Sequence, residues 1–184
     1  MKRNMLCSKI VDMKLLGLIA FFIFASKVVA QPLNVFDVAR TGTVEQAKAL
    51  LKSDPKIFNT TNSEGYSPLT LACYRSNNDV AKLLLDNGSD INKQSPMGTP
   101  LMASVVKGNL EMAKILLEKK ADPDLTDTKK TTALIYAVQF KNIEMIKLLL
   151  EYDPNQSQKD DSGKTAFEYA VFSNNQEIIN LFKK

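Results

Sequence analysis

Apolar and polar positions along residues 33–184 recur with a period of 32–33 residues. Each period begins with a short apolar segment and continues with a second segment whose apolar residues fall at helical spacing, as at Val80, Leu83 and Leu84. The pattern predicts a pair of short helices in every period. Four periods place a good helix-capping residue before the first helix, at Ser67, Thr99, Thr132 and Thr165.

Turn-forming residues separate the predicted helices. The two helices of a pair are expected to meet at Asn77-Asn78, Gly108-Asn109 and Asn174-Asn175, because Asn and Gly accept left-handed backbone conformations. Residues 53–63 lack a helical period and are expected to form a loop. Short hairpin-like tips are expected between pairs at Gly65, Gly98 and Gly163.

The periods divide into five repeats, at about 33–61, 62–94, 95–126, 127–159 and 160–184. One pair of helices cannot bury its apolar residues alone, whereas stacked neighbours share a continuous core. The first repeat is degenerate and the last has a polar outer face, so we expect these two to close the ends of the stack. The sequence therefore predicts one elongated domain over residues 31–184.

Two segments resemble the T-P-L-H-x-A motif of the ankyrin repeat: residues 67–72 read SPLTLA and residues 99–104 read TPLMAS. Residues 88–92 (GSDIN) and 108–111 (GNLE) resemble two further parts of that repeat. The resemblance implies an all-α ankyrin-repeat solenoid of about five helix–turn–helix repeats with short β-hairpin-like connecting tips. The His of the motif is absent, and its place is taken by Asp37, Thr70, Met102, Ile135 and Glu168.

The resemblance also implies a site, because partner proteins of ankyrin-like stacks commonly bind the groove formed by the hairpin tips and the first helices. Tyr74, Val106, Phe140 and Phe172 fall near the end of the first helix in four repeats and are expected to line up as an apolar stripe along that groove. Aromatic and arginine side chains are typical of interface hot spots; the alternative is that the stripe packs between repeats as core. The predicted partner-binding residues are Tyr66, Tyr74, Arg75, Val106, Lys107, Lys129, Gln139, Phe140, Lys164 and Phe172.

Residues 1–30 have the three-part pattern of a secretion signal. Basic residues precede an apolar run of eleven at 15–25, and Val28 and Ala30 stand where a signal peptidase requires small residues. An eleven-residue helix spans only about 16 Å, so a transmembrane helix is the weaker interpretation. We expect cleavage after Ala30, export, and a periplasmic location, with secretion as the alternative. Ankyrin-like repeats of eukaryotes are mostly intracellular, so a signal peptide favours a bacterial source.

The net charge of +4 belongs to this N-terminal segment. Five basic residues and one acidic residue lie within residues 1–30, which leaves 19 of each sign from Gln31 onward. A neutral body offers no electrostatic attraction for nucleic acid or an anionic membrane, and no basic or acidic groove is evident from the sequence. The protein is expected to be monomeric by itself and to leave the membrane after cleavage.

The residues available for chemistry argue against an enzyme. The chain contains no His, which excludes His-based triads and His-ligated metals. Gly163-Lys164-Thr165 lacks the first glycine of a phosphate-binding loop, and the Asp clusters lack the spacing of a calcium loop, so we expect no cofactor. Cys73 is either a reactive thiol or, as we favour, a small buried hydrophobe.

The sequence thus predicts a non-catalytic module that binds an unidentified partner protein through the groove. Two alternatives stay open. One is a secreted effector or an immunity-type protein that acts on a host or toxin protein. The other is an enzyme or ligand-binding accessory protein that uses Cys73 or an Asp cluster.

Overall fold

The computed structural model describes residues 33–183, so the expected signal peptide at 1–30 lies outside the described residues. Ten α-helices and one short 3-10 helix, η1 (Ile57–Asn59), lie in this part of the chain. Five helices form an inner layer: α2 (Val35–Thr41), α4 (Pro68–Arg75), α6 (Pro100–Val106), α8 (Ala133–Gln139) and α10 (Ala166–Phe172). The other five form an outer layer: α3 (Val44–Ser53), α5 (Asn78–Asp86), α7 (Leu110–Glu118), α9 (Ile143–Leu150) and α11 (Gln176–Leu181).

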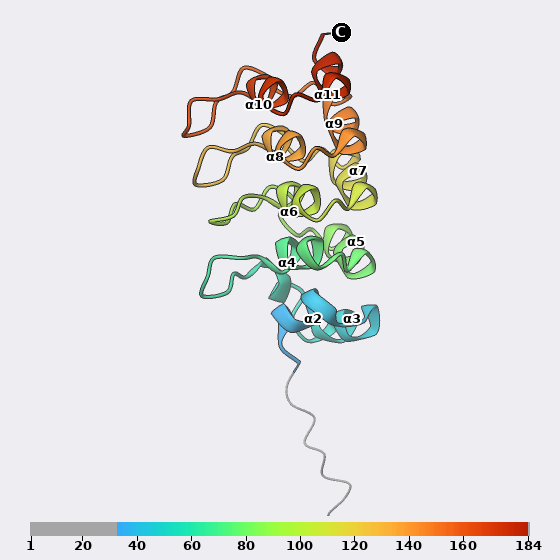
Figure 1. Cartoon of the computed structure of the whole chain (residues 1–184). Coiled ribbons are helices and arrows are strands. Elements are labelled where there is room, and N and C mark those ends of the chain that lie inside the picture. The colour runs from blue at the N-terminus through green and yellow to red at the C-terminus, as the bar shows by residue number, and fades with distance from the viewer. Residues whose placement is uncertain (1–32, 184) are drawn as a thin grey trace, which may run out of the picture. The chain divides into compact units, whose positions relative to one another are not determined.

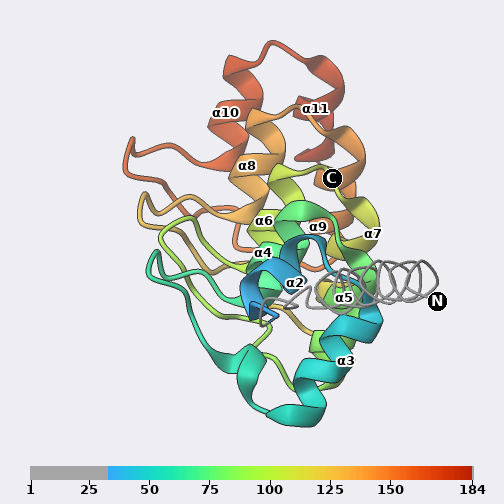
Figure 2. The ribbon, with the colours of Figure 1, turned by 90° about the horizontal axis from the view of Figure 1, so that it is seen from below.

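The helices stack as pairs, one pair above the next (Figure 1). Each inner helix packs against its own outer helix and against the inner helix of the next pair. The connecting tips project to one side of the inner helices (Figure 2). Between residues 33 and 183 the tips contain no β-strand and only isolated bridges, Ser95 with Gly98 and Thr126 with Thr132. The prediction of an all-α solenoid with hairpin-like tips is therefore confirmed.

The predicted helix caps are confirmed by their hydrogen bonds. Ser67, Thr99, Thr132 and Thr165 each accept a bond from the backbone N–H three residues later, at donor–acceptor distances of 3.1–3.3 Å. Asn109, Asn142 and Asn175 cap three of the outer helices in the same way. Local sequence signals therefore define where most of the helices begin.

The turn within the second repeat differs from the prediction. The left-handed residue there is Ser76 (φ 57°), not one of the two asparagines, and Asn77 has φ −82°. The Asn77 side chain instead donates to the backbone carbonyls of Ala39 and Gly42, at 3.2 and 3.0 Å. Asn77 thereby joins the second repeat to the first. The expected left-handed residues at Gly108 and Asn174 are confirmed.

A continuous apolar core runs between the two layers. Leu84, Leu116 and Leu149 of the outer helices are fully buried, and Leu69, Leu101 and Leu134 of the inner helices are at most 2% exposed. Met102 and Ile135, which replace the motif His, are each 1% exposed. In these two repeats, apolar packing by Met102 and Ile135 therefore takes the place of the contacts that the motif imidazole would make.

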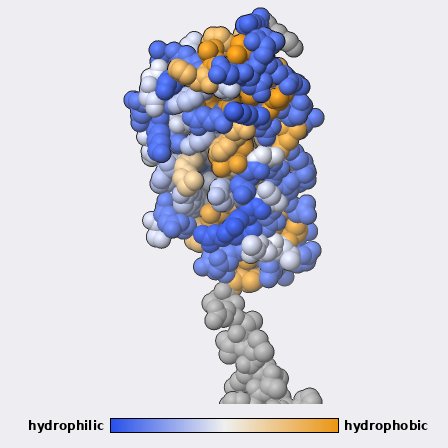
Figure 3. All heavy atoms as spheres, viewed as in Figure 1, coloured by the Kyte–Doolittle hydropathy of each residue, from blue (hydrophilic) through white to orange (hydrophobic). Residues whose placement is uncertain are grey.

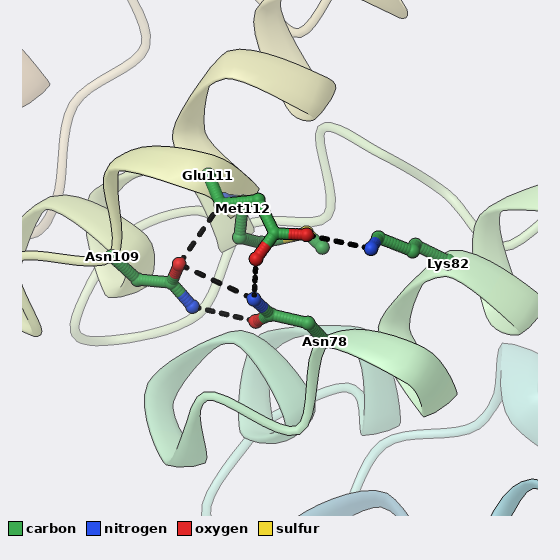
Figure 4. Close-up of polar contacts among 5 residues, drawn as sticks. All are labelled: Asn78, Lys82, Asn109, Glu111 and Met112. Carbon is green, nitrogen blue, oxygen red and sulfur yellow. Dashed lines mark hydrogen bonds and ion pairs between the residues drawn. The ribbon is translucent and has the colours of Figure 1, made fainter.

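A polar network joins α5 to α7 across adjacent repeats (Figure 4). Asn78 donates to the Glu111 carboxylate at 2.9 Å and accepts from the Asn109 amide at 2.6 Å. Lys82 forms an ion pair with the other Glu111 oxygen at 2.6 Å. The Lys82 ammonium first, and then the Asn78 amide, lower the pKa of the Glu111 carboxyl.

Replacement of Glu111 by glutamine is expected to make stability less sensitive to acid. The pKa of Glu111 is lower in the folded state than in the unfolded chain. The contacts of its carboxylate therefore stabilise the folded protein fully at pH values above the ordinary carboxyl pKa. This stabilisation is lost as the pH falls through the lowered pKa of the folded state. Melting temperatures of the two proteins should differ at neutral pH and converge in the acid range. A difference that stays constant as the pH falls would contradict this role of the carboxylate.

Candidate protein-interaction surface

The last turns of four inner helices lie one above another, because α4 packs on α6, α6 on α8, and α8 on α10. We define the inner face as the surface made by these last turns and by the tips at residues 62–67, 94–99, 127–132 and 160–165. All ten predicted partner-binding residues lie in these segments or directly after them. The surface seen in Figure 3 is mostly hydrophilic, with hydrophobic residues in small separate patches along the stack.

Most of the predicted residues are accessible. Phe140 and Phe172 have 55% and 69% of their surface exposed, and Tyr74 has 37%. Phe140 and Phe172 therefore do not pack between repeats as core, which was the alternative interpretation of the stripe. Of the others, four are exposed and three are half-buried: Arg75, Lys107, Lys129 and Gln139 in the first group, and Tyr66, Val106 and Lys164 in the second.

Replacement of Phe140 by alanine is expected to lower the free energy of unfolding by about 1 kcal/mol or less. The side chain is more than half exposed, and its ring stacks on that of Tyr136 with centroids 6.2 Å apart. Urea denaturation of the variant and the parent protein measures the difference. A loss of several kcal/mol would mean that Phe140 is a core residue.

Lysine side chains cover the aromatic rings of the inner face. The Lys107 ammonium lies 5.1 Å from the centre of the Tyr74 ring, and the Lys164 ammonium lies 5.2 Å from that of Phe172. Such contacts are attractive because the ring face carries negative charge. The Lys107 contact joins two repeats, and both contacts order long side chains on an accessible surface.

Two tyrosines missing from the sequence prediction fix the tips of the last two repeats. The Tyr136 hydroxyl donates to Asp127 and the Tyr169 hydroxyl donates to Asp160, each at 2.6 Å. The other oxygen of each aspartate accepts two backbone N–H bonds within its own tip. A signal was present in the sequence, because Asp and Tyr stand nine residues apart in two consecutive repeats.

These bonds change the acidity of the groups involved. Burial, and then the Asp127 carboxylate, raise the pKa of Tyr136 to about 12. Desolvation alone would raise the pKa of Asp160, but the bonds from the Tyr169 hydroxyl and two backbone N–H groups outweigh it and lower that pKa. Asp160 is thus held as an anion, and its carboxylate organises the tip of the last repeat.

A hollow of about 240 Å³ opens on the inner face between α4 and α6. In these helices Leu71 and Ala103 occupy the position that Tyr136 and Tyr169 fill in α8 and α10. Four of the predicted partner-binding residues line the same hollow, namely Tyr66, Tyr74, Arg75 and Val106. The structure therefore brings these four together. Phe140, directly after α8, and Phe172, at the end of α10, lie outside the hollow.

Four of the predicted partner-binding residues on the inner face are basic. Arg75, Lys107, Lys129 and Lys164 have no carboxylate within 4.0 Å among residues 33–183. The tips of the same face also carry Glu64, Asp127, Asp160 and Asp161, so basic and acidic residues on it nearly balance. The expectation that the groove is neither basic nor acidic therefore stays a prediction.

Cys73 does not have the environment of a reactive thiol. Its side chain is 0% exposed, and burial raises the pKa of the thiol to about 12. The structure supports the interpretation of Cys73 as a buried hydrophobe. Within the described part of the chain, no group of three or more His, Cys, Asp or Glu residues is arranged to hold a metal ion. No helix among residues 33–183 is both long enough and apolar enough to cross a bilayer.

Comparison with known proteins identifies the repeat. A family model described as ankyrin repeats (three copies) matches residues 35–127 and 101–184. The chain is 31% identical over 102 residues to ankyrin repeat and SAM domain-containing protein 6 of Rattus norvegicus, a match covering 54% of the chain and 12% of that protein. It is 34% identical over 97 residues to BCL-6 corepressor-like protein 1 of Homo sapiens, a match that covers 52% of the chain and 5% of that protein.

An ankyrin repeat protein of Acanthamoeba polyphaga mimivirus is 42% identical over 66 residues, which cover 35% of the chain and 41% of that protein. The chain thus spans less than half the length of each of these relatives. The similarity lies in the repeats.

Proposed function

Because this chain belongs to the ankyrin-repeat family, whose repeats generally act as protein-interaction modules, we propose that it is a non-catalytic module that binds a partner protein through its inner face. The observation that carries the proposal is the set of accessible aromatic side chains at the ends of three inner helices, at Tyr74, Phe140 and Phe172. Large aromatic side chains beside basic ones are the usual source of binding energy at protein interfaces.

The rigidity of the inner face favours binding. The inner helices are fixed by packing on one another, and the tips of the last two repeats are fixed by the Tyr136 and Tyr169 bonds. A surface that is already ordered loses little conformational entropy when a partner docks. Binding by such a surface requires no catalytic group, which agrees with the burial of Cys73.

The test is affinity capture with the purified protein as bait and an extract of the source cells. A second bait carries Tyr74→Ser, Phe140→Ser and Phe172→Ser, and a control bait carries Leu110→Ser and Lys114→Ser on the outer helix α7. Circular dichroism checks that all three are folded. A partner held by the parent and control baits but lost by the inner-face variant supports the proposal. A partner held equally by all three would place binding elsewhere.

We also propose that the protein is exported, with a periplasmic or secreted location. The support is the order of the N-terminal residues: basic residues, an apolar run at 15–25, and small side chains before Gln31. Intact-mass measurement of protein recovered outside the cytoplasm is expected to give a chain that begins at Gln31. A mass that includes residues 1–30 would contradict cleavage after Ala30.

A further inference from the structure

The α4–α6 hollow has a size that suits a single side chain. Its volume is about 240 Å³, whereas pockets for drug-sized ligands and cofactors have volumes of roughly 300–1,000 Å³. The hollow is open to solvent on the inner face rather than enclosed, so a side chain projecting from another protein has direct access to it.

The lining of the hollow is apolar. Leu71 and Ala103 are less than 10% exposed and form its floor, and the rings of Tyr66 and Tyr74 line it. The one polar residue at the floor is Thr70, whose hydroxyl is already hydrogen-bonded to that of Ser67 at 2.9 Å. An apolar side chain therefore matches the lining better than a polar one, since a polar group would be buried there without a partner.

The surroundings of the hollow are cationic. Arg75 lines it, and Lys107 lies over the adjacent Tyr74 ring; neither has a carboxylate within 4.0 Å among the described residues. Arg40 also lines the hollow but is paired with Asp37 at 3.0 Å, and Glu64 is the one acid in the lining. A bound segment with carboxylates next to its apolar residue would complement Arg75 and Lys107.

Tyrosines fill the corresponding space in the last two repeats. In α8 and α10, Tyr136 and Tyr169 stand at the position of Leu71 and Ala103, and their hydroxyls reach the aspartates of their tips. A tyrosine ring at that position occupies the space beside the inner helix. The hollow therefore results from the smaller residues at Leu71 and Ala103.

We propose that the α4–α6 hollow is an anchor pocket that receives one apolar side chain from an acidic segment of the partner protein, whose carboxylates pair with Arg75 and Lys107. This inference rests on the proposed function and specifies the chemistry of the partner. The apolar residue supplies most of the binding energy, and the carboxylates set the orientation and accelerate association.

The test uses a library of random short peptides displayed on phage and selected against the whole protein. The expected result is enrichment of peptides in which Asp or Glu flanks a large apolar residue. Synthetic copies of these peptides should bind about tenfold more weakly, or worse, to Ala103→Tyr, which fills the hollow in the manner of Tyr136. A similar loss is expected for Arg75→Glu with Lys107→Glu, two exposed changes that leave the core intact. Leu110→Tyr, which adds a tyrosine to the outer layer, serves as the matched control.

Three outcomes would overturn the inference. They are enrichment of basic or uncharged peptides, no enrichment at all, and enriched peptides that bind the Ala103→Tyr and charge-reversal variants as tightly as the parent. If the Ala103→Tyr variant does not fold, the charge-reversal variant decides alone. Failure of this inference can be distinguished from failure of the proposed function. The distinguishing result is a captured partner that is lost by the Tyr74, Phe140 and Phe172 triple variant but retained by Ala103→Tyr. That result would support binding at the inner face and exclude the hollow as the anchor pocket.

Discussion

Replacement of Leu116 by alanine is expected to lower the free energy of unfolding by about 2–5 kcal/mol. Leu116 lies in α7 of the central repeat and is 0% exposed, so its removal deletes buried apolar surface and leaves a cavity. Because each repeat is stabilised by its neighbours, damage to the central repeat weakens the docking of the repeats on both sides. Urea denaturation followed by circular dichroism measures the loss.

Leu110→Ala is the matched control on the same helix. Leu110 is the first residue of α7 and is 40% exposed, so its replacement is expected to change the free energy of unfolding by about 0.5 kcal/mol or less. Equal losses for the two leucines would contradict the position of the core between the helix layers.

The second large effect is expected at Asp127. Its carboxylate accepts bonds from the backbone N–H groups of Lys129 and Thr131, at 2.8 and 2.9 Å, and from the Tyr136 hydroxyl at 2.6 Å. Asp127→Ala leaves all three donors without this acceptor, and we expect a loss of about 1–3 kcal/mol in the free energy of unfolding. Asp127→Asn is expected to cost less, because Asn62 accepts the equivalent backbone bonds in the second repeat.

Titration of the phenol groups provides an independent measurement. Because the pKa of Tyr136 is raised in the folded state, its interaction stabilises the fold fully below the ordinary tyrosine pKa. That contribution is lost as the pH rises through about 12. Ultraviolet absorbance should show one tyrosine that ionises near this value in the parent, and Asp127→Asn should lower its pKa. An unchanged titration would contradict the bond between Tyr136 and Asp127.

Much of the fold was predictable because its signals are local. Ser67 and Thr99 stand directly before proline at the start of an apolar segment, and each caps its helix as expected. The repeat period then determined that the helices stack. The left-handed residue Ser76 was not predicted, because Asn77 is directed by contacts with Ala39 and Gly42 in the neighbouring repeat. Contacts of this kind leave no local signal.

The candidate site was predictable only in part. The position of Tyr74 and Phe140 in the repeat indicated exposure, and both are accessible. The hollow was not predicted because it results from small side chains. Its presence can be inferred only by comparing Ala103 with the larger Tyr136 at the same position of the next repeat.

The contacts between neighbouring pairs have a consequence for folding kinetics. Within residues 33–183, the elements in extensive contact belong to the same repeat or to adjacent repeats. Folding therefore closes only short loops, which limits its entropic cost and is typical of chains that fold in microseconds to milliseconds. The hollow between α4 and α6 exists only after these two repeats have docked. A partner that binds there stabilises that junction by mass action and slows the separation of the two repeats.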